Sequence, residues 1–132
     1  MFHVVIHALA ATSPFGRPAV ADAVWAILLN ELTRPSVHLL CAALMPDHLH
    51  LIVSPRQKPI TDWVRDFKAY STNTVRPLTQ TASIWQRRFY DRRLRSAEEL
   101  EVCADYVLRN PVAADLVEAS AEWPWMGAWL DG

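Results

Sequence analysis

Residues 2–10 are mostly apolar and contain the β-branched side chains Val4, Val5 and Ile6, which is typical of a β-strand. A strand places His3, Val5 and His7 on one face and the residues between them on the other. Residues 36–45 and 48–54 read as two buried strands, joined by a tight turn that contains a proline and an aspartate. The pattern therefore predicts an isolated strand followed later by a β-hairpin.

Two segments with a helical period separate and follow these strands. Apolar side chains recur three or four positions apart over residues 19–33, and Pro35 is expected to end that helix. A second helix is expected to open at Pro59 and to break at Pro77. Residues 83–96 form an extended, strongly basic stretch, which is expected to be a strand with a loop.

A third helix follows the basic stretch. Ser96 is its expected N-cap, in a capping box with Glu99, and Pro111 is expected to stop it at Asn110. The resulting order, β-α-β-β-α-β-α, matches the split βαβ arrangement of ferredoxin-like α+β folds. In that arrangement an antiparallel sheet carries helices on one face and leaves the other face available.

Length and composition fit one cytoplasmic domain. The 132 residues, 52% of them hydrophobic, are enough for a single core, so we expect one domain over residues 1–132. Uncharged runs are too short or too broken by proline to cross a membrane, and the first residues lack the basic start of a signal peptide. Cys41 and Cys103 lie in apolar runs without metal-site spacing and are expected to be buried thiols.

Charge is distributed unevenly along the chain. The net charge is −1, but residues 56–95 contain ten Lys or Arg against three Asp, while acidic residues dominate after Ser96. Eleven of the thirteen basic residues are Arg, which is suited to forked contacts with phosphate. The basic third therefore indicates either a nucleic-acid surface or a solvated face that is rich in arginine.

Two histidines interrupt the apolar strand at residues 48–54. Side chains two positions apart in a strand share a face, so His48 and His50 point together while Leu49 and Leu51 enter the core. Paired imidazoles on one face are two ligands for a metal ion. The alternative is a pair of partly buried histidines whose hydrogen bonds go to backbone carbonyls.

The third helix offers a candidate nucleophile. Tyr106 and Asn110 are four residues apart and therefore neighbours on one helix face. A phenol attacks phosphorus when a metal makes the phosphate more electrophilic, and Asn110 offers a carbonyl oxygen to the same metal. Alternatively, Tyr106 is a half-buried aromatic and Asn110 is a helix stop. Tyr70 and Tyr90 are rival nucleophiles, but neither has an Asn four residues later.

Three separated blocks, "MPDHLHLIV", "IWQRRFYDRRLRS" and "YVLRNPVAADLV" followed by "WPW", resemble the REP-associated tyrosine transposases. These proteins are relatives of the insertion-sequence transposases in the single-tyrosine branch of the HUH nucleases. The resemblance extends from the first strand to Trp125. The chain departs from the family's usual Asn-Pro-Val-Arg-Ala-Gly by placing Ala113 and Asp115 where Arg and Gly are typical.

The resemblance implies roles for individual residues. It implies that His48 and His50 bind a divalent ion, Mg²⁺ or Mn²⁺, that Asn110 is a third ligand, and that Tyr106 is the nucleophile. The implied reaction is cleavage and rejoining of single-stranded DNA at hairpin-forming repeats through a 5′-phosphotyrosine. Side chains expected to contact this DNA are Lys68, Arg87, Arg88, Arg92, Arg93 and Arg95.

Several alternatives stay open at the level of the sequence. The active site could be built within one chain or across a homodimer. The same fold could serve as a regulator that binds DNA hairpins without catalysis. A nucleotide hydrolase of the histidine-triad kind is disfavoured because Ile52 stands where that signature requires a third histidine.

Overall fold

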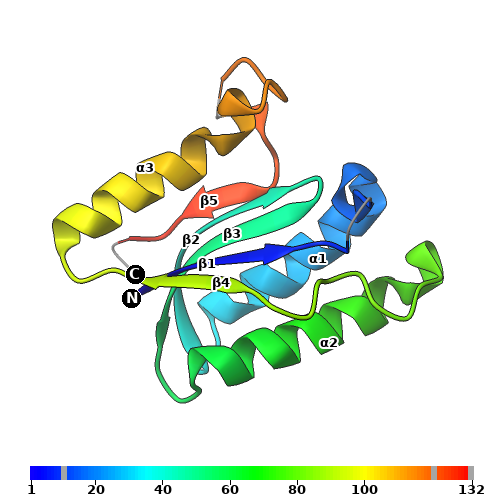
Figure 1. Cartoon of the computed structure of the whole chain (residues 1–132), viewed down its shortest axis with the longest axis horizontal. Coiled ribbons are helices and arrows are strands. Elements are labelled where there is room, and N and C mark those ends of the chain that lie inside the picture. The colour runs from blue at the N-terminus through cyan, green and yellow to red at the C-terminus, as the bar shows by residue number, and fades with distance from the viewer. Residues whose placement is uncertain (10–11, 120–121, 131–132) are drawn as a thin grey trace.

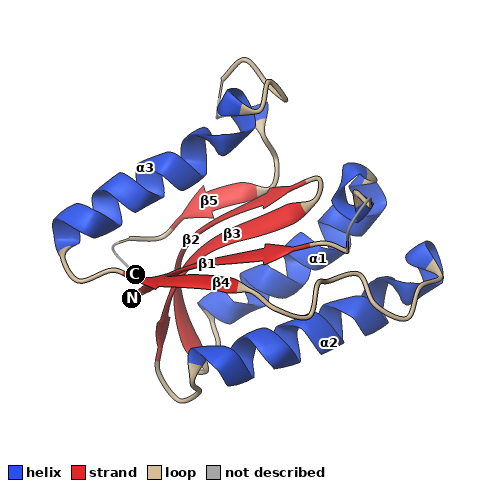
Figure 2. Cartoon of the chain, in the orientation of Figure 1, coloured by secondary structure: helices blue, strands red, loops and turns tan. Residues whose placement is uncertain are grey.

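Five strands form one antiparallel sheet in the computed structural model of the chain, which describes residues 1–9, 12–119 and 122–130 (Figures 1 and 2). The predicted α+β fold with an antiparallel sheet and a β2–β3 hairpin is confirmed. The spatial order is β4-β1-β3-β2-β5, which makes β4 and β5 the two edges. The strands are β1 (Phe2–His7), β2 (Val37–Met45), β3 (His48–Pro55), β4 (Tyr90–Arg93) and β5 (Met126–Ala128).

Helices lie on both faces of the sheet (Figure 1). The helices α1 (Pro18–Leu29) and α2 (Ile60–Thr79) pack together on one face, as expected. The third helix, α3 (Ala97–Ala113), lies on the opposite face, against β2, β3 and β5. The expectation that all helices share one face is therefore wrong for α3, whose apolar stripe needs a partner of its own. Two short 3₁₀ turns, η1 (Pro14–Gly16) and η2 (Asn30–Leu32), flank α1.

Strand alternation divides the core into two clusters. Leu49 and Leu51 of β3 point into the larger cluster beneath α1 and α2, as predicted. Ile52 points the other way, into a smaller cluster with Cys103 and Val107 of α3. The pairing register shifts in β2 between Leu39 and Cys41, and this irregularity puts the consecutive residues 40 and 41 in the cluster under α3.

Two helices continue past the prolines that were expected to end them. Pro77 lies inside α2, which ends only at Thr79, and Pro111 lies inside α3, which ends at Ala113. A proline removes one N–H donor and its ring crowds the carbonyl four residues earlier, and each helix ends two residues after its proline. The predicted N-cap is confirmed: the Ser96 hydroxyl accepts a hydrogen bond from the Glu99 N–H at 3.1 Å.

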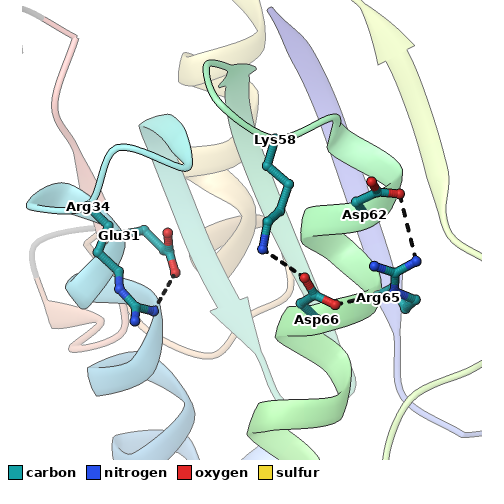
Figure 3. A network of polar contacts seen from close by, with 6 residues as sticks. All are labelled: Glu31, Arg34, Lys58, Asp62, Arg65 and Asp66. Atoms are coloured by element: carbon teal, nitrogen blue, oxygen red, sulfur yellow. Dashed lines mark hydrogen bonds and ion pairs between the residues drawn. The ribbon is translucent and has the colours of Figure 1, made fainter.

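Charged side chains form ion pairs near α1 and α2, where Glu31 is buried and its partners are partly or fully exposed (Figure 3). The shortest contact joins Lys58 Nζ to Asp66 Oδ2 at 2.8 Å, and it lowers the pKa of the Asp66 carboxyl. Arg65 lies 3.2 Å from Asp66, and Glu31 lies 3.7 Å from Arg34. Exposed ion pairs contribute little to stability, so the apolar contact between the helices holds this layer together.

A buried hydrogen bond fixes the segment that leads into β4. The indole N–H of Trp85 donates to Ser71 Oγ at 2.9 Å, and the Ser71 hydroxyl donates to the Phe67 carbonyl at 2.7 Å. Both Trp85 and Ser71 are buried. Further along, Lys68 Nζ donates to the Arg87 carbonyl at 2.9 Å. Helix α2 therefore holds the start of the basic segment in place.

Replacing Ser71 with Ala is expected to lower the free energy of unfolding by about 1–3 kcal/mol, because the Trp85 N–H would be left buried without an acceptor. Thr74→Ala is the matched control, since the exposed Thr74 hydroxyl donates to the Tyr70 carbonyl at 2.9 Å. The control is expected to change stability by less than about 0.5 kcal/mol. Urea unfolding followed by tryptophan fluorescence measures both, and equal losses would contradict the assigned role of Ser71.

The two cysteines agree with the sequence-based expectation. Cys41 and Cys103 are free and buried, and burial raises the pKa of the Cys41 thiol to about 12. Within the described ranges, no helix combines the length and the apolar character that a membrane span requires.

Candidate active site

Four histidines gather on the face of the sheet that α3 partly covers. In the antiparallel pairing of β1 with β3, His7 lies opposite His48, and His3 lies opposite Ile52. His50 lies opposite Val5, a pair that stands between those two pairs in the register. Because all these positions have the same strand parity, the four imidazoles share one face. The predicted pairing of His48 with His50 on one face is confirmed.

The nitrogens of His48 and His50 converge. Their Nε2 atoms are 3.1 Å apart, and the ring centroids are 4.8 Å apart. The other nitrogen of His48, Nδ1, donates a hydrogen bond to Asp47 Oδ1 at 2.7 Å. Since a carboxylate can only accept, the neutral His48 ring carries its proton on Nδ1 and turns the lone pair of Nε2 toward His50.

His3 contacts the opposite side of His50. His3 Nε2 lies 3.1 Å from His50 Nδ1, and the two rings are nearly parallel with centroids 5.3 Å apart. Burial, together with the neighbouring imidazoles of His48, His3 and His7, lowers the pKa of His50 to about 3. Burial and then the Arg92 guanidinium also lower the pKa of His3. His3 and His50 are therefore neutral at ordinary pH.

Tyr106 of α3 stands over these imidazoles. Its ring centroid is 5.7 Å from that of His50 and 6.2 Å from that of His3, edge-on in both contacts. The side chain is 57% exposed, so a ligand can reach it. The tyrosine and the histidines line one pocket of about 680 Å³, which is large enough for a nucleotide. The lining residues are His3, Val5, His7, His48, His50, Tyr90, Arg92, Val102, Cys103, Tyr106 and Asn110.

The pocket has features that fit a divalent ion. Two ligands at about 2.1 Å from an ion, in adjacent octahedral positions, are roughly 3.0 Å apart, close to the observed separation of the His48 and His50 Nε2 atoms. Among the described residues, no group of three His, Cys, Asp or Glu side chains surrounds a common point. Asn110 lines the same pocket, and its amide Nδ2 lies 3.5 Å from the Tyr106 carbonyl. An ion held here would therefore need an oxygen ligand, such as the Asn110 carbonyl, water or phosphate.

The rival tyrosines lie in different places. Tyr70, on α2, lines a separate small cavity next to Glu31 and Trp63. Tyr90, on β4, lines the histidine pocket, with its ring centroid 6.3 Å from that of His3. Position alone therefore separates Tyr70 from the histidines but leaves Tyr90 beside them.

The basic residues named as DNA contacts fall into three groups. Arg92 lines the histidine pocket, beside Cys103. Lys68 lies outside the pocket and bonds the Arg87 carbonyl. The remaining arginines are exposed, and no ion pair joins them to a carboxylate in the described part of the chain: these are Arg87, Arg88, Arg93 and Arg95.

The sequence does not assign His3 and His7 to the site. Strand geometry places both on one face of β1, but no local pattern connects that face with the histidine pair of β3. The connecting fact is the β1–β3 register, which joins residues more than forty positions apart. The sequence does contain one signal for them: His3 and His7 share a strand face, as His48 and His50 do.

The chain has the same fold as two solved proteins that are described as transposases. It superposes with a TM-score of 0.75 on the structure described as a REP-associated tyrosine transposase bound to a REP hairpin, at 20% identity, covering 95% of this chain and 74% of that one. It also superposes on a crystal structure described as a putative transposase from Deinococcus radiodurans, with a TM-score of 0.60 and 18% identity. That match covers 83% of this chain and 88% of the other.

The chain belongs to the IS200-like transposase family, whose model matches residues 1–110. A protein of Haemophilus influenzae named "Putative REP-associated tyrosine transposase" is 28% identical in a 94-residue alignment that covers 62% of this chain. The alignment covers 53% of that protein, so the chain spans about half the length of the curated relative that it matches. The predicted resemblance is therefore confirmed at the level of the family.

Proposed function

We propose that the chain cleaves and rejoins single-stranded DNA at hairpin-forming repeats, as a metal-dependent tyrosine transposase. One observation carries the proposal: the Tyr106 phenol and the paired Nε2 atoms of His48 and His50 line a single pocket. The relative that was solved with a REP hairpin supports hairpin DNA as the partner.

Each residue has a chemical part in this reaction. The Tyr106 phenol oxygen attacks the phosphorus and forms a 5′-phosphotyrosine, while the bond to the 3′ oxygen breaks and that oxygen leaves as a hydroxyl. His48, His50 and Asn110 would hold Mg²⁺ or Mn²⁺, which supplies charge stabilisation at the phosphate oxygens. Attack by a 3′-hydroxyl on the phosphotyrosine reverses the step and joins two strands. The link conserves the phosphodiester's energy, so no nucleotide cofactor is required.

Incubation with end-labelled hairpin strands and Mn²⁺ tests the proposal directly. A 5′-phosphotyrosine retains the 3′ part of the strand, so the 3′ label is expected to migrate with the protein on a denaturing gel. The 5′ label is expected to appear in a shorter free fragment. A fully duplex strand of the same sequence is the control and should give no adduct. Binding without any adduct would instead favour a DNA-binding regulator.

The histidine-triad alternative finds no support in the site. Ile52 stands at the position where a third histidine would be needed, and its side chain is fully buried in the cluster under α3. The same incubation with a labelled nucleotide in place of DNA is expected to leave the nucleotide intact.

Replacing Arg92 with Ala is expected to weaken binding of hairpin DNA, because Arg92 lines the pocket beside the proposed phosphate position. Loss of one phosphate contact should reduce the slope of log K against log salt by about 0.7. Arg93→Ala, at the next position of β4 and on the opposite face, should have a smaller effect. Arg65→Ala, in the ion pairs of α2, is the control and should bind normally. Fluorescence anisotropy over a salt series measures all four proteins, and an Arg65 effect equal to that of Arg92 would contradict the proposed interface.

A further inference from the structure

His3 belongs to a chain of ring nitrogens that ends at a carboxylate. His3 Nε2 is 3.1 Å from His50 Nδ1, His50 Nε2 is 3.1 Å from His48 Nε2, and His48 Nδ1 is 2.7 Å from Asp47 Oδ1. His3 and His50 are buried, with exposed fractions of 8% and 5%. Water therefore has little access to these nitrogens, and each contact needs one donor and one acceptor from the rings themselves.

Without a bound ion, and with all three imidazoles neutral, only one proton arrangement satisfies every contact from His3 to Asp47. Asp47 accepts from His48 Nδ1, so His48 Nε2 must accept from His50 Nε2. A neutral His50 then has no proton on Nδ1, and that atom must accept from His3 Nε2. In this arrangement His3 donates to His50, His50 donates to His48, and His48 donates to Asp47.

Ion binding requires a different arrangement. The Nε2 atoms of His48 and His50 must then both be unprotonated, so that each directs a lone pair at the ion. His50 can therefore no longer carry its proton on Nε2. The proton can be held on Nδ1 of the buried His50 ring only if Nδ1 finds an acceptor. The atom at 3.1 Å is His3 Nε2, which accepts when the His3 ring holds its own proton on Nδ1.

We infer that His3 is a positioning residue that lets His50 exchange tautomers: His50 carries its proton on Nε2 in the metal-free protein and on Nδ1 when an ion is bound. This inference rests on the proposed function of His48 and His50 as metal ligands. Each ring moves one proton from Nε2 to Nδ1, so neither changes its charge. His3 is suited to the task because an imidazole nitrogen can donate in one state and accept in the other, whereas a carboxylate or carbonyl only accepts.

Two substitutions separate hydrogen bonding at His3 from packing. In His3→Leu the side chain fills space but neither donates nor accepts, so a proton on His50 Nδ1 would be buried without a partner. Affinity for Zn²⁺, a diamagnetic probe ion, is expected to fall by about 10- to 100-fold. The amide of Gln in His3→Gln can either donate or accept, and this variant is expected to keep affinity within about threefold of the native protein.

Nitrogen NMR of the imidazole rings tests the tautomers themselves. Long-range ¹H–¹⁵N spectra of the native protein should show the His50 proton on Nε2 without metal and on Nδ1 with Zn²⁺. Calorimetry should give the stated loss for His3→Leu and the recovery for His3→Gln, and thermal unfolding of both variants tests for a general loss of fold. An unchanged His50 tautomer, or native Zn²⁺ affinity in a folded His3→Leu, would overturn the inference.

These measurements involve no DNA. A failure of the tautomer exchange is therefore distinguishable from a failure of the proposed reaction, which would appear as native protein that binds Zn²⁺ as described but forms no adduct with hairpin strands.

Discussion

Tyr106→Phe is expected to abolish the covalent DNA adduct, with the rate of cleavage reduced by a factor on the order of 10³ or more. The substitution removes one oxygen atom, and that oxygen is the proposed nucleophile. Because the ring stays, its edge-on contacts with His3 and His50 are kept, and metal binding and DNA affinity are expected to remain native. Adduct formation on denaturing gels, beside anisotropy for DNA binding, separates the two effects.

Two other tyrosines are the controls for this prediction. Tyr90→Phe matters most, since Tyr90 lines the same pocket and lies as close to His3 as Tyr106 does. Tyr70→Phe changes a residue in a different cavity. Both variants should form the adduct at a native rate. An adduct that persists in Tyr106→Phe and disappears in Tyr90→Phe would move the nucleophile to the sheet edge.

Substitution of the histidine pair is expected to have the second largest effect. His48→Ala and His50→Ala each remove one of the two converging nitrogens, so affinity for Mn²⁺ should fall sharply. Charge stabilisation by a metal is worth several kcal/mol, so cleavage is expected to slow by a factor on the order of 10² to 10³. Mn²⁺ titration and cleavage rates at saturating DNA measure the two losses together.

The chain contains a matched control for a histidine substitution. His38 is also on a strand of the sheet but does not line the histidine pocket, so His38→Ala should keep metal binding and cleavage. His50 is buried, so unfolding curves must show that His50→Ala is folded at the assay temperature. Native cleavage by a folded His48→Ala/His50→Ala double variant would remove the pair from the mechanism.

Mixing the two kinds of variant tests how the site is assembled. If one chain supplies the whole pocket, Tyr106→Phe mixed with His48→Ala should stay inactive, because neither protein has a complete site. Recovery of activity on mixing would show that a tyrosine from one chain reaches the histidines of another.

Much of the fold was predictable because strand alternation is a local property. The parity of residues 48–54 alone placed Leu49 and Leu51 in the core and the two histidines outside it, and the structure agrees. The side of the sheet taken by α3 was not predictable in this way, since residues on both faces of β2 and β3 are buried. The three-residue strand β5 also has no local signal. Its place is fixed by distant backbone contacts, such as the bond from the Trp129 N–H to the Leu40 carbonyl at 2.7 Å.

The site was predictable only where its residues lie close together in the sequence. The pairs His48 with His50 and Tyr106 with Asn110 each follow from a fixed spacing on one element. Their meeting in one pocket depends on how α3 crosses the sheet, and the resemblance to a family supplied that expectation. The contribution of His3 depends on a strand register that no local pattern reveals.

The departure from the family pattern after α3 has a backbone explanation. Asp115 stands where Gly is typical, and its φ of 58° lies in the left-handed region that favours glycine. Aspartate tolerates this region better than most residues because its short side chain can bond nearby backbone groups. Asp115 therefore allows a tight turn after α3, in which the Leu116 N–H donates to the Pro111 carbonyl at 2.9 Å.

The position of β4 at the edge of the sheet affects more than DNA. An uncovered edge strand exposes backbone groups that another chain can pair with, and such pairing leads to aggregation. All four residues of β4 are exposed, and three of them, Asp91, Arg92 and Arg93, are charged, which disfavours pairing of this edge with another strand. The arginines proposed to attract a phosphate backbone would thus also keep the protein monodisperse at high concentration. Replacing these arginines with uncharged residues would then weaken DNA binding and also lower the solubility of the protein.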